Sequence, residues 1–257
     1  MLALIPGRAE EGAFIQVVTN ERAYNIPYPL NEYKRLEFAR VGGSRFERRG
    51  VDLNISTDEL TITGSLRYRN MKPISYDIMG PFKYLPMECR HSVISMDHDI
   101  EGELILNGEP IDFSGGRGYI EGDRGHSFPD KYIWAQCNCF DEPCSIMVAL
   151  ARIPFAGLKF WGCICVVLWR GKEYRLATYK GVRIVAKSPT RIELEQGKYR
   201  LVISLNNAGG HPLRAPDKGS MTRIIHESSN CEARFRFYIG GNEYFDKTSN
   251  CASFEYV

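Results

Sequence analysis

Near the middle of the chain stands the stretch Glu103-Leu-Ile-Leu-Asn-Gly-Glu-Pro-Ile-Asp-Phe113. Two short runs with apolar residues flank Asn107-Gly108, and the Asn-Gly pair readily takes the positive φ angles that a type I′ turn requires. The stretch therefore predicts a tight β-hairpin. Gly240-Gly241 predicts a second hairpin of this kind near the C-terminus.

A two-residue period continues in both directions from the central hairpin. Val51-Asp-Leu-Asn-Ile55 and Arg234-Phe-Arg-Phe237 alternate apolar with polar residues, as half-buried strands do. Further strands are expected at residues 13–19, 60–67, 133–140, 158–168, 174–179 and 199–205, and one helical turn at 30–35. Many short strands separated by turn signals predict an all-β barrel or sandwich.

The length and one glycine-rich connection predict the domain organisation. A chain of 257 residues suits one large β domain or two smaller ones. The most glycine-rich connection is Ser114-Gly-Gly-Arg-Gly118. We therefore expect two β units of similar size, residues 1–116 and 117–257.

Charge and hydropathy exclude several classes of protein. There are 33 Lys and Arg against 31 Asp and Glu, for a net charge of +2, and Arg45–Arg49 is the longest basic cluster. A lone cluster predicts a solvated surface, so we expect no nucleic-acid partner. The apolar start ends at Pro6, too early for a secretory signal, and the longest unbroken apolar run, 161–169, has only strand length. We expect a cytoplasmic protein without a transmembrane segment, whose contact with a membrane is peripheral at most.

Eight cysteines invite a disulfide or zinc interpretation. Without a secretory signal we expect reduced thiols. The pairs Cys137/Cys139 and Cys163/Cys165 lie in strand-like runs, where residues two apart are about 6.5–7 Å apart. Tetrahedral zinc, with Zn–S bonds near 2.3 Å, needs its sulfur ligands closer together. We therefore expect small buried side chains and no metal site.

The segment with most chemical information is Gly118-Tyr-Ile-Glu-Gly-Asp-Arg-Gly-His-Ser-Phe-Pro-Asp-Lys-Tyr-Ile-Trp-Ala-Gln-Cys-Asn138. In two extended runs joined by a turn, alternate residues share a face. One predicted face carries Tyr119, Glu121 and Asp123, and another carries Tyr132, Trp134, Gln136 and Asn138. Aromatic rings with a few polar groups are typical of ligand pockets. The alternative is that Trp134 fills the core, while Gln136 and Asn138 bond to loop backbone.

This segment resembles the signature of tocopherol cyclase and its bacterial relatives, in which an acidic Gly-Tyr segment and Ser-Phe-Pro precede Trp-x-Gln-Cys-Asn. Similar landmarks follow the same order at Met79-Gly-Pro-Phe82, Met87-Glu-Cys-Arg-His91, Ala177-Thr-Tyr179 and Ala215-Pro-Asp-Lys-Gly219. The chain is identified as a member of the tocopherol cyclase-like family over nearly its whole length. The resemblance implies two lipocalin-like antiparallel β-barrel or sandwich units packed together. Relatives begin with an extra strand, so the first barrel either lacks that strand or does not need it.

The resemblance also implies a reaction, the cofactor-free cyclisation of a prenylated quinol. An acid protonates an alkene, and the phenol oxygen captures the cation. Such a site needs a protonated carboxyl, aromatic faces and the exclusion of water. The candidate acids are Glu121, Asp123 and Glu88. The candidate residues for binding an apolar or lipid ligand are Tyr119, Arg124, His126, Trp134, Gln136, Asn138 and His91.

Several of these residues have simpler interpretations. Glu88 suits an ion pair with Arg90, and Asp123 suits a turn or a pair with Arg124. Arg124 stands where the family usually has Trp, and a cation there opposes a protonated carboxyl. This departure weakens the cyclisation hypothesis and leaves the pocket hypothesis intact.

Three functions therefore remain open: a cyclase or isomerase, a non-catalytic carrier of an apolar ligand, and a structural β protein with a filled core. Cavity size separates the third from the others, because ligand pockets exceed about 300 Å³.

Overall fold

The chain folds into three antiparallel β-sheets. The computed structural model describes residues 1–35, 37–155, 158–206, 211–217 and 220–257. Within these residues the sheets contain three, eight and ten strands. The first sheet consists of β1 (Ala3–Arg8), β2 (Ala13–Val18) and β3 (Ala23–Tyr28). The second consists of β4 (Tyr33–Lys34), β5 (Ala39–Val41), β6 (Ser44–Glu47), β7 (Gly50–Ser56), β8 (Thr61–Arg69), β9 (Cys89–Leu106), β10 (Glu109–Asp112) and β11 (Gly116–Gly125).

The third sheet contains the C-terminal half of the chain. Its strands are β12 (Tyr132–Cys137), β13 (Cys144–Phe155), β14 (Leu158–Trp169), β15 (Lys172–Ala177), β16 (Arg183–Ser188), β17 (Arg191–Gln196), β18 (Tyr199–Leu205), β19 (His211–Asp217), β20 (Ser220–Ile239) and β21 (Asn242–Tyr256). Short 3₁₀ turns lie at η1 (Leu30–Glu32), η2 (Gly80–Tyr84) and η3 (Thr178–Lys180). None of the helices in the described part of the chain is long and apolar enough for a membrane crossing.

Both predicted hairpins are confirmed. β9 and β10 pair antiparallel around Asn107-Gly108, whose φ angles are 50° and 88°. β20 and β21 pair around Gly240-Gly241, with φ angles of 62° and 84°. Positive φ at both central residues is the requirement of a type I′ turn, and this explains why these dipeptides end one strand and start the next.

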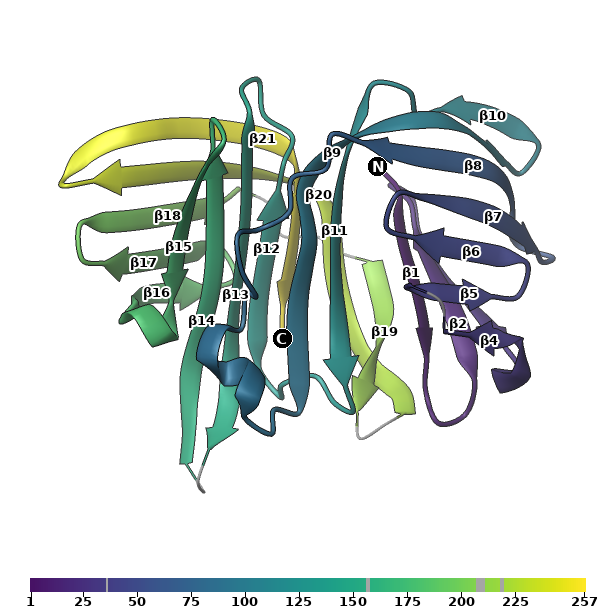
Figure 1. Cartoon of the computed structure of the whole chain (residues 1–257), viewed down its shortest axis with the longest axis horizontal. Helices are drawn as coiled ribbons and strands as arrows, with labels where there is room; N and C mark the ends of the chain where they lie inside the picture. The colour runs from purple at the N-terminus through teal and green to yellow at the C-terminus, as the bar shows by residue number, and fades with distance from the viewer. Residues whose placement is uncertain (36, 156–157, 207–210, 218–219) are drawn as a thin grey trace.

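Alternating side chains build two separate apolar cores. One core lies between the first and second sheets and contains buried residues such as Ile15, Val41 and Ile55. The third sheet curls around the other, to which strands far apart in the sequence contribute residues such as Val148 and Phe237. The predicted fold class, two packed all-β units, is therefore confirmed (Figure 1).

A third apolar cluster joins the two units. Ile78 and Met96, from the N-terminal half, pack with Met147 and Val166 of the third sheet. The long strands β9 and β11 lie beside β12 in the centre of the molecule (Figure 1). The predicted division between residues 116 and 117 stays a prediction. The pairing of β11 with β9 joins residues 116–125 to the N-terminal strands.

The structure corrects one cysteine prediction and describes only part of one family landmark. Cys137, Cys163 and Cys165 are buried, but Cys139 was predicted to be buried and is exposed, because β12 ends at Cys137. Of the family landmark at 215–219, Lys218 and Gly219 lie outside the described residues.

Candidate functional site

A carboxylate on β11 is surrounded by polar groups from three strands. Glu121 Oε2 accepts a hydrogen bond of 2.6 Å from the Tyr119 hydroxyl and one of 3.1 Å from Trp134 Nε1 on β12. His91 Nε2, on β9, lies 3.1 Å from the same oxygen without the alignment of a hydrogen bond. The Glu121 side chain is only 24% exposed. Donors that converge on one oxygen hold the carboxylate in place.

His91 lies between two carboxylates. Its Nδ1 is 3.0 Å from Oδ1 of Asp123, the residue directly opposite it in the β9–β11 ladder. Burial of the ring favours the neutral imidazole, but the charges of Glu121 and Asp123 outweigh this effect and raise the pKa of His91 well above its usual range. The ring is therefore an imidazolium at neutral pH. His91, Glu121 and Asp123 together carry one net negative charge.

The backbone of β11 explains how Tyr119 joins this group. The register between β11 and β9 shifts between Gly118 and Ile120 and again between Ile120 and Glu121. Such irregularities turn side chains relative to a regular strand. Burial, followed by the negative charge of Glu121, raises the pKa of the Tyr119 hydroxyl well above its usual range, so this group remains a hydrogen-bond donor. We call Tyr119, Glu121, Asp123, His91 and Trp134 the Glu121 cluster.

The alternation predicted for β12 is confirmed. Ile133, Ala135 and Cys137 point into the core of the third sheet, while Trp134 reaches the opposite side and contacts Glu121. Tyr132 also lies on this opposite side and donates a hydrogen bond of 2.7 Å to Glu255. One face of this strand thus stabilises the C-terminal core, and the other delivers an indole N–H to the N-terminal sheet.

Gln136 and Asn138 were predicted to line the same pocket, and the structure places them next to the cluster rather than in it. Asn138 Nδ2 donates to the carbonyl oxygen of Gly118 at 2.8 Å, and Gln136 Nε2 donates to Asn138 Oδ1 at 3.3 Å. These bonds fasten the end of β12 to the start of β11. Asn138 thus bonds to backbone, as the alternative interpretation expects of both residues, whereas Gln136 bonds to a side chain.

Three other predicted site residues are not brought to the cluster. Glu88, Arg124 and His126 are exposed. The His126 backbone N–H donates to the Glu88 carbonyl at 3.1 Å, and Arg124 lies opposite Arg90 in the β-ladder. The cation that was expected to oppose a protonated carboxyl therefore does not contact Glu121 or Asp123.

One neighbour of the cluster was not singled out from the sequence as a site residue. Cys89 Sγ lies 3.4 Å from Asp123 Oδ1 in donor geometry. Burial, followed by the negative charge of Asp123, raises the pKa of this thiol far above its usual range, so Cys89 is a neutral donor and a poor nucleophile. The alternation Cys89-Arg90-His91 was the available signal, because it places Cys89 and His91 on one face of a strand.

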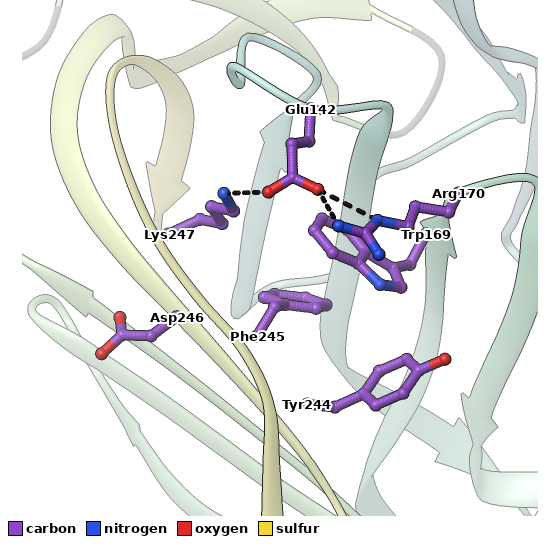
Figure 2. A pocket seen from close by; sticks show the side chains of 7 residues that line it. All are labelled: Glu142, Trp169, Arg170, Tyr244, Phe245, Asp246 and Lys247. Atoms are coloured by element: carbon purple, nitrogen blue, oxygen red, sulfur yellow. Dashed lines mark hydrogen bonds and ion pairs between the residues drawn. The ribbon is translucent and has the colours of Figure 1, made fainter.

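The structure also contains two hollows that differ in character. A small apolar hollow of about 80 Å³ lies between η2 and the β13–β14 pair, lined by Phe82, Leu85, Met87, Ile153 and Phe160. A larger hollow of about 340 Å³ lies on the third sheet (Figure 2). Neither is lined by a residue of the Glu121 cluster. Phe82 and Met87 of the small hollow pack against the same apolar cluster as Tyr119.

The chemistry open to the Glu121 cluster is proton transfer. It combines an oriented carboxylate, a charged imidazole and two aromatic rings beside an apolar cluster. Among the described residues, no group of three or more His, Cys, Asp or Glu side chains has an arrangement that could hold a metal ion.

Comparison with known sequences gives the family. A sequence profile described as tocopherol cyclase-like matches residues 57–255, which include the whole Glu121 cluster. The chain belongs to the tocopherol cyclase-like family. No curated protein matches it significantly.

Solved structures similar to this member of the tocopherol cyclase-like family share its fold at low identity. Kievitone hydratase from Nectria haematococca is 12% identical with a TM-score of 0.53, over 99% of this chain and 82% of that chain. CghA with Sch210972 is 11% identical with a TM-score of 0.56, over 96% of this chain and 79% of that chain. A putative AttH from Nitrosomonas europaea is 12% identical with a TM-score of 0.50, over 95% and 81%. These likenesses confirm the predicted fold class.

Proposed function

We propose that this protein catalyses the cofactor-independent cyclisation or isomerisation of an apolar prenyl-type substrate, with Glu121 as the proton donor. The observation that carries the proposal is the convergence of Tyr119, Trp134 and His91 on Glu121 Oε2. All three contacts end on one oxygen. No described residue donates a hydrogen bond to the other carboxylate oxygen, Oε1, which is therefore the atom we assign to the transferred proton.

The charge balance of the cluster supports a bound proton. Without a ligand, the Glu121 side chain is 24% and the Asp123 side chain 30% exposed to solvent. Together with His91 they carry one net negative charge. An apolar ligand that covers them removes this solvation, and an uncompensated buried charge is unfavourable. Uptake of one proton by Glu121 neutralises the group, while His91 and Asp123 remain an ion pair.

The same contacts orient Glu121 for the transfer. Tyr119 and Trp134 donate hydrogen bonds to the carboxylate that remains when the proton passes to an alkene. The alkene carbon gains the hydrogen, and a tertiary cation forms beside the restored carboxylate and two aromatic rings, which stabilise it. The phenol oxygen then forms the C–O bond, and its proton returns to Glu121. The substrate and product have the same composition.

The packing next to the cluster supports an apolar substrate. Tyr119 packs against the apolar cluster that contains Ile78 and Met96, and Trp134 packs against the one that contains Val18 and Tyr132. The small hollow beside this packing is too small for a whole prenylated ring, since ligand pockets begin at about 300 Å³. We therefore propose that ligand binding displaces η2, whose Phe82 lines the hollow.

A reaction in D₂O tests the proposal. The protein is incubated with a prenylated hydroquinone that has one trisubstituted alkene, and the products are analysed by mass spectrometry. Cyclisation gives a product with one carbon-bound deuterium and otherwise the mass of the substrate. Glu121→Gln abolishes it, whereas the matched control Glu88→Gln, a change at an exposed carboxylate, does not. Full turnover by Glu121→Gln would exclude Glu121 as the acid.

The same experiment distinguishes two other outcomes. A product heavier by one water would indicate hydration, the activity that the name of the structural relative kievitone hydratase states for that protein. Recovery of the bound probe unaltered at every time point would instead favour a carrier. One observation favours the carrier: the charged groups of the cluster already satisfy one another, so that the site remains stable without reacting.

A further inference from the structure

The larger hollow lies at one end of the third sheet and shares no residue with the Glu121 cluster. Three separate segments build it. Glu142 comes from the connection between β12 and β13, Trp169 and Arg170 come from the end of β14 and the following turn, and residues 244–247 come from the start of β21 (Figure 2). Its volume of about 340 Å³ reaches the range of small-molecule sites, which recur at the mouths of β-barrels.

Aromatic rings form the apolar part of this hollow. Trp169 and Phe245 are each only 5% exposed, and their ring centroids are 4.7 Å apart at an angle of 32°. Tyr244 is 45% exposed, and its hydroxyl accepts a hydrogen bond of 3.2 Å from Tyr174. The buried pair belongs to the core of the third sheet and forms the rigid floor of the hollow, while Tyr244 is the lining ring that is open to a ligand.

Two cations stand beside these rings and share one carboxylate. Lys247 Nζ donates to Glu142 Oε1 at 2.6 Å, and Arg170 Nε donates to Glu142 Oε2 at 3.0 Å (Figure 2). The Arg170 guanidinium lies 5.1 Å and the Lys247 ammonium 5.8 Å from the centroid of Trp169. These three charged groups therefore carry one net positive charge above an aromatic surface.

The remaining acidic residue does not cancel this charge. Asp246 forms an ion pair with Arg234, which does not line the hollow. Figure 2 shows the Asp246 side chain directed away from Glu142 and Arg170. A ligand cation would meet two like charges whose carboxylate is already engaged twice. A ligand anion would meet the unused donors of Lys247 and Arg170.

We propose that this hollow is a second binding site, specific for a small planar aromatic anion such as an aromatic carboxylate or sulfonate. The ring packs against the exposed Tyr244 ring over the Trp169–Phe245 pair, and the acid group binds Lys247 and Arg170 beside Glu142. The assignment does not depend on the chemistry of the Glu121 cluster.

A pair of fluorescent probes tests this site in the full-length protein. Anilinonaphthalene sulfonate combines aromatic rings with a sulfonate, and N-phenylnaphthylamine has the same rings without the charge. We expect the sulfonate to bind at one site and at least about tenfold more tightly than the neutral probe, the effect of charge-assisted hydrogen bonds. Equal affinity for both probes would overturn the proposal, because it would place them at a purely apolar site.

Substitutions locate the binding. Lys247→Met weakens sulfonate binding by about tenfold, and Lys247→Arg retains it. Lys187→Met is the matched control, since Lys187 Nζ lies 4.9 Å from the centroid of Trp161, a similar contact elsewhere on the third sheet.

Arg170→Asn is a second test. Arg170 is an exposed turn residue with φ of 48°, a conformation that Asn tolerates. Unchanged affinity in both Lys247→Met and Arg170→Asn, or an equal loss in Lys187→Met, would overturn the assignment.

Discussion

Trp134 Nε1, on the third sheet, lies 3.1 Å from Glu121 Oε2, on the second, and its N–H donates the hydrogen bond that joins the two β units at the candidate site. The bond makes the position of the carboxylate depend on the packing between the sheets. It also distinguishes Trp134 from a core tryptophan, since the ring alone would not need this orientation.

Removal of this donor should reduce proton transfer more than stability. Trp134→Phe keeps an aromatic ring and loses the N–H, so the Glu121 carboxylate becomes less fixed and less stabilised. We expect a clear loss of turnover on the prenylated hydroquinone, with about 1 kcal/mol or less lost from the free energy of unfolding in urea. Trp161→Phe is the control, because this half-buried ring lies outside the Glu121 cluster. An equal loss of turnover in both variants would contradict the assigned role.

His91 should make the protein less stable at alkaline pH. The folded protein holds the imidazolium more tightly than the unfolded chain, whose pKa for this group is 6.5. The stabilisation is therefore complete below pH 6.5 and is lost as pH rises through the raised folded pKa. Urea unfolding between neutral and alkaline pH should show a decline that His91→Gln lacks. A parallel decline in both proteins would show that His91 does not cause it.

His98 should make the protein less stable at acidic pH. Its ring is 2% exposed and packs 4.6 Å from Tyr68, and burial lowers its pKa from 6.5 to about 4. The unfolded chain therefore binds more protons between these values, and stability falls as pH falls from 6.5 toward 4. The loss is on the order of 3 kcal/mol. His98→Gln should flatten this part of the curve, and NMR titration of the ring should locate the pKa directly. A ring that titrates near 6.5 in the folded protein would contradict the prediction.

The sequence predicted most of the fold because its local signals agree with the long-range structure. Asn107-Gly108 determines a hairpin by its own backbone preference, and the alternation of Ile133, Ala135 and Cys137 determines which side of β12 faces the core of the third sheet. Both signals are local, so no knowledge of partner strands is needed.

The candidate site was less accessible to sequence reasoning because it depends on strand register. His91 and Asp123 are 32 residues apart, and they meet only because β9 and β11 pair in one register. Periodicity places Arg124 on the face opposite Asp123, and this is why its charge does not reach the cluster although the two residues are adjacent.

Gly118, the first residue of the signature segment, should be required for the packing of β11 on β9. A Cβ at this position would lie 2.1 Å from His98 Nε2, and His98 is buried and cannot move aside freely. Gly118→Ala should therefore cost about 1–3 kcal/mol in the free energy of unfolding. Gly122→Ala, on the same strand, is the control, because its Cβ would meet only Ser92 Oγ, at 3.8 Å.

A double-mutant cycle separates this clash from a general effect of alanine in the strand. If the His98 ring is the obstacle, Gly118→Ala should cost much less in a His98→Ala background, and the coupling between the two sites should exceed about 0.5 kcal/mol. The Gly118 carbonyl also accepts the bond from Asn138 Nδ2, so a shift of β11 would weaken the attachment of β12. Additive effects of the two substitutions would mean that the strand, and not the His98 ring, opposes a side chain at position 118.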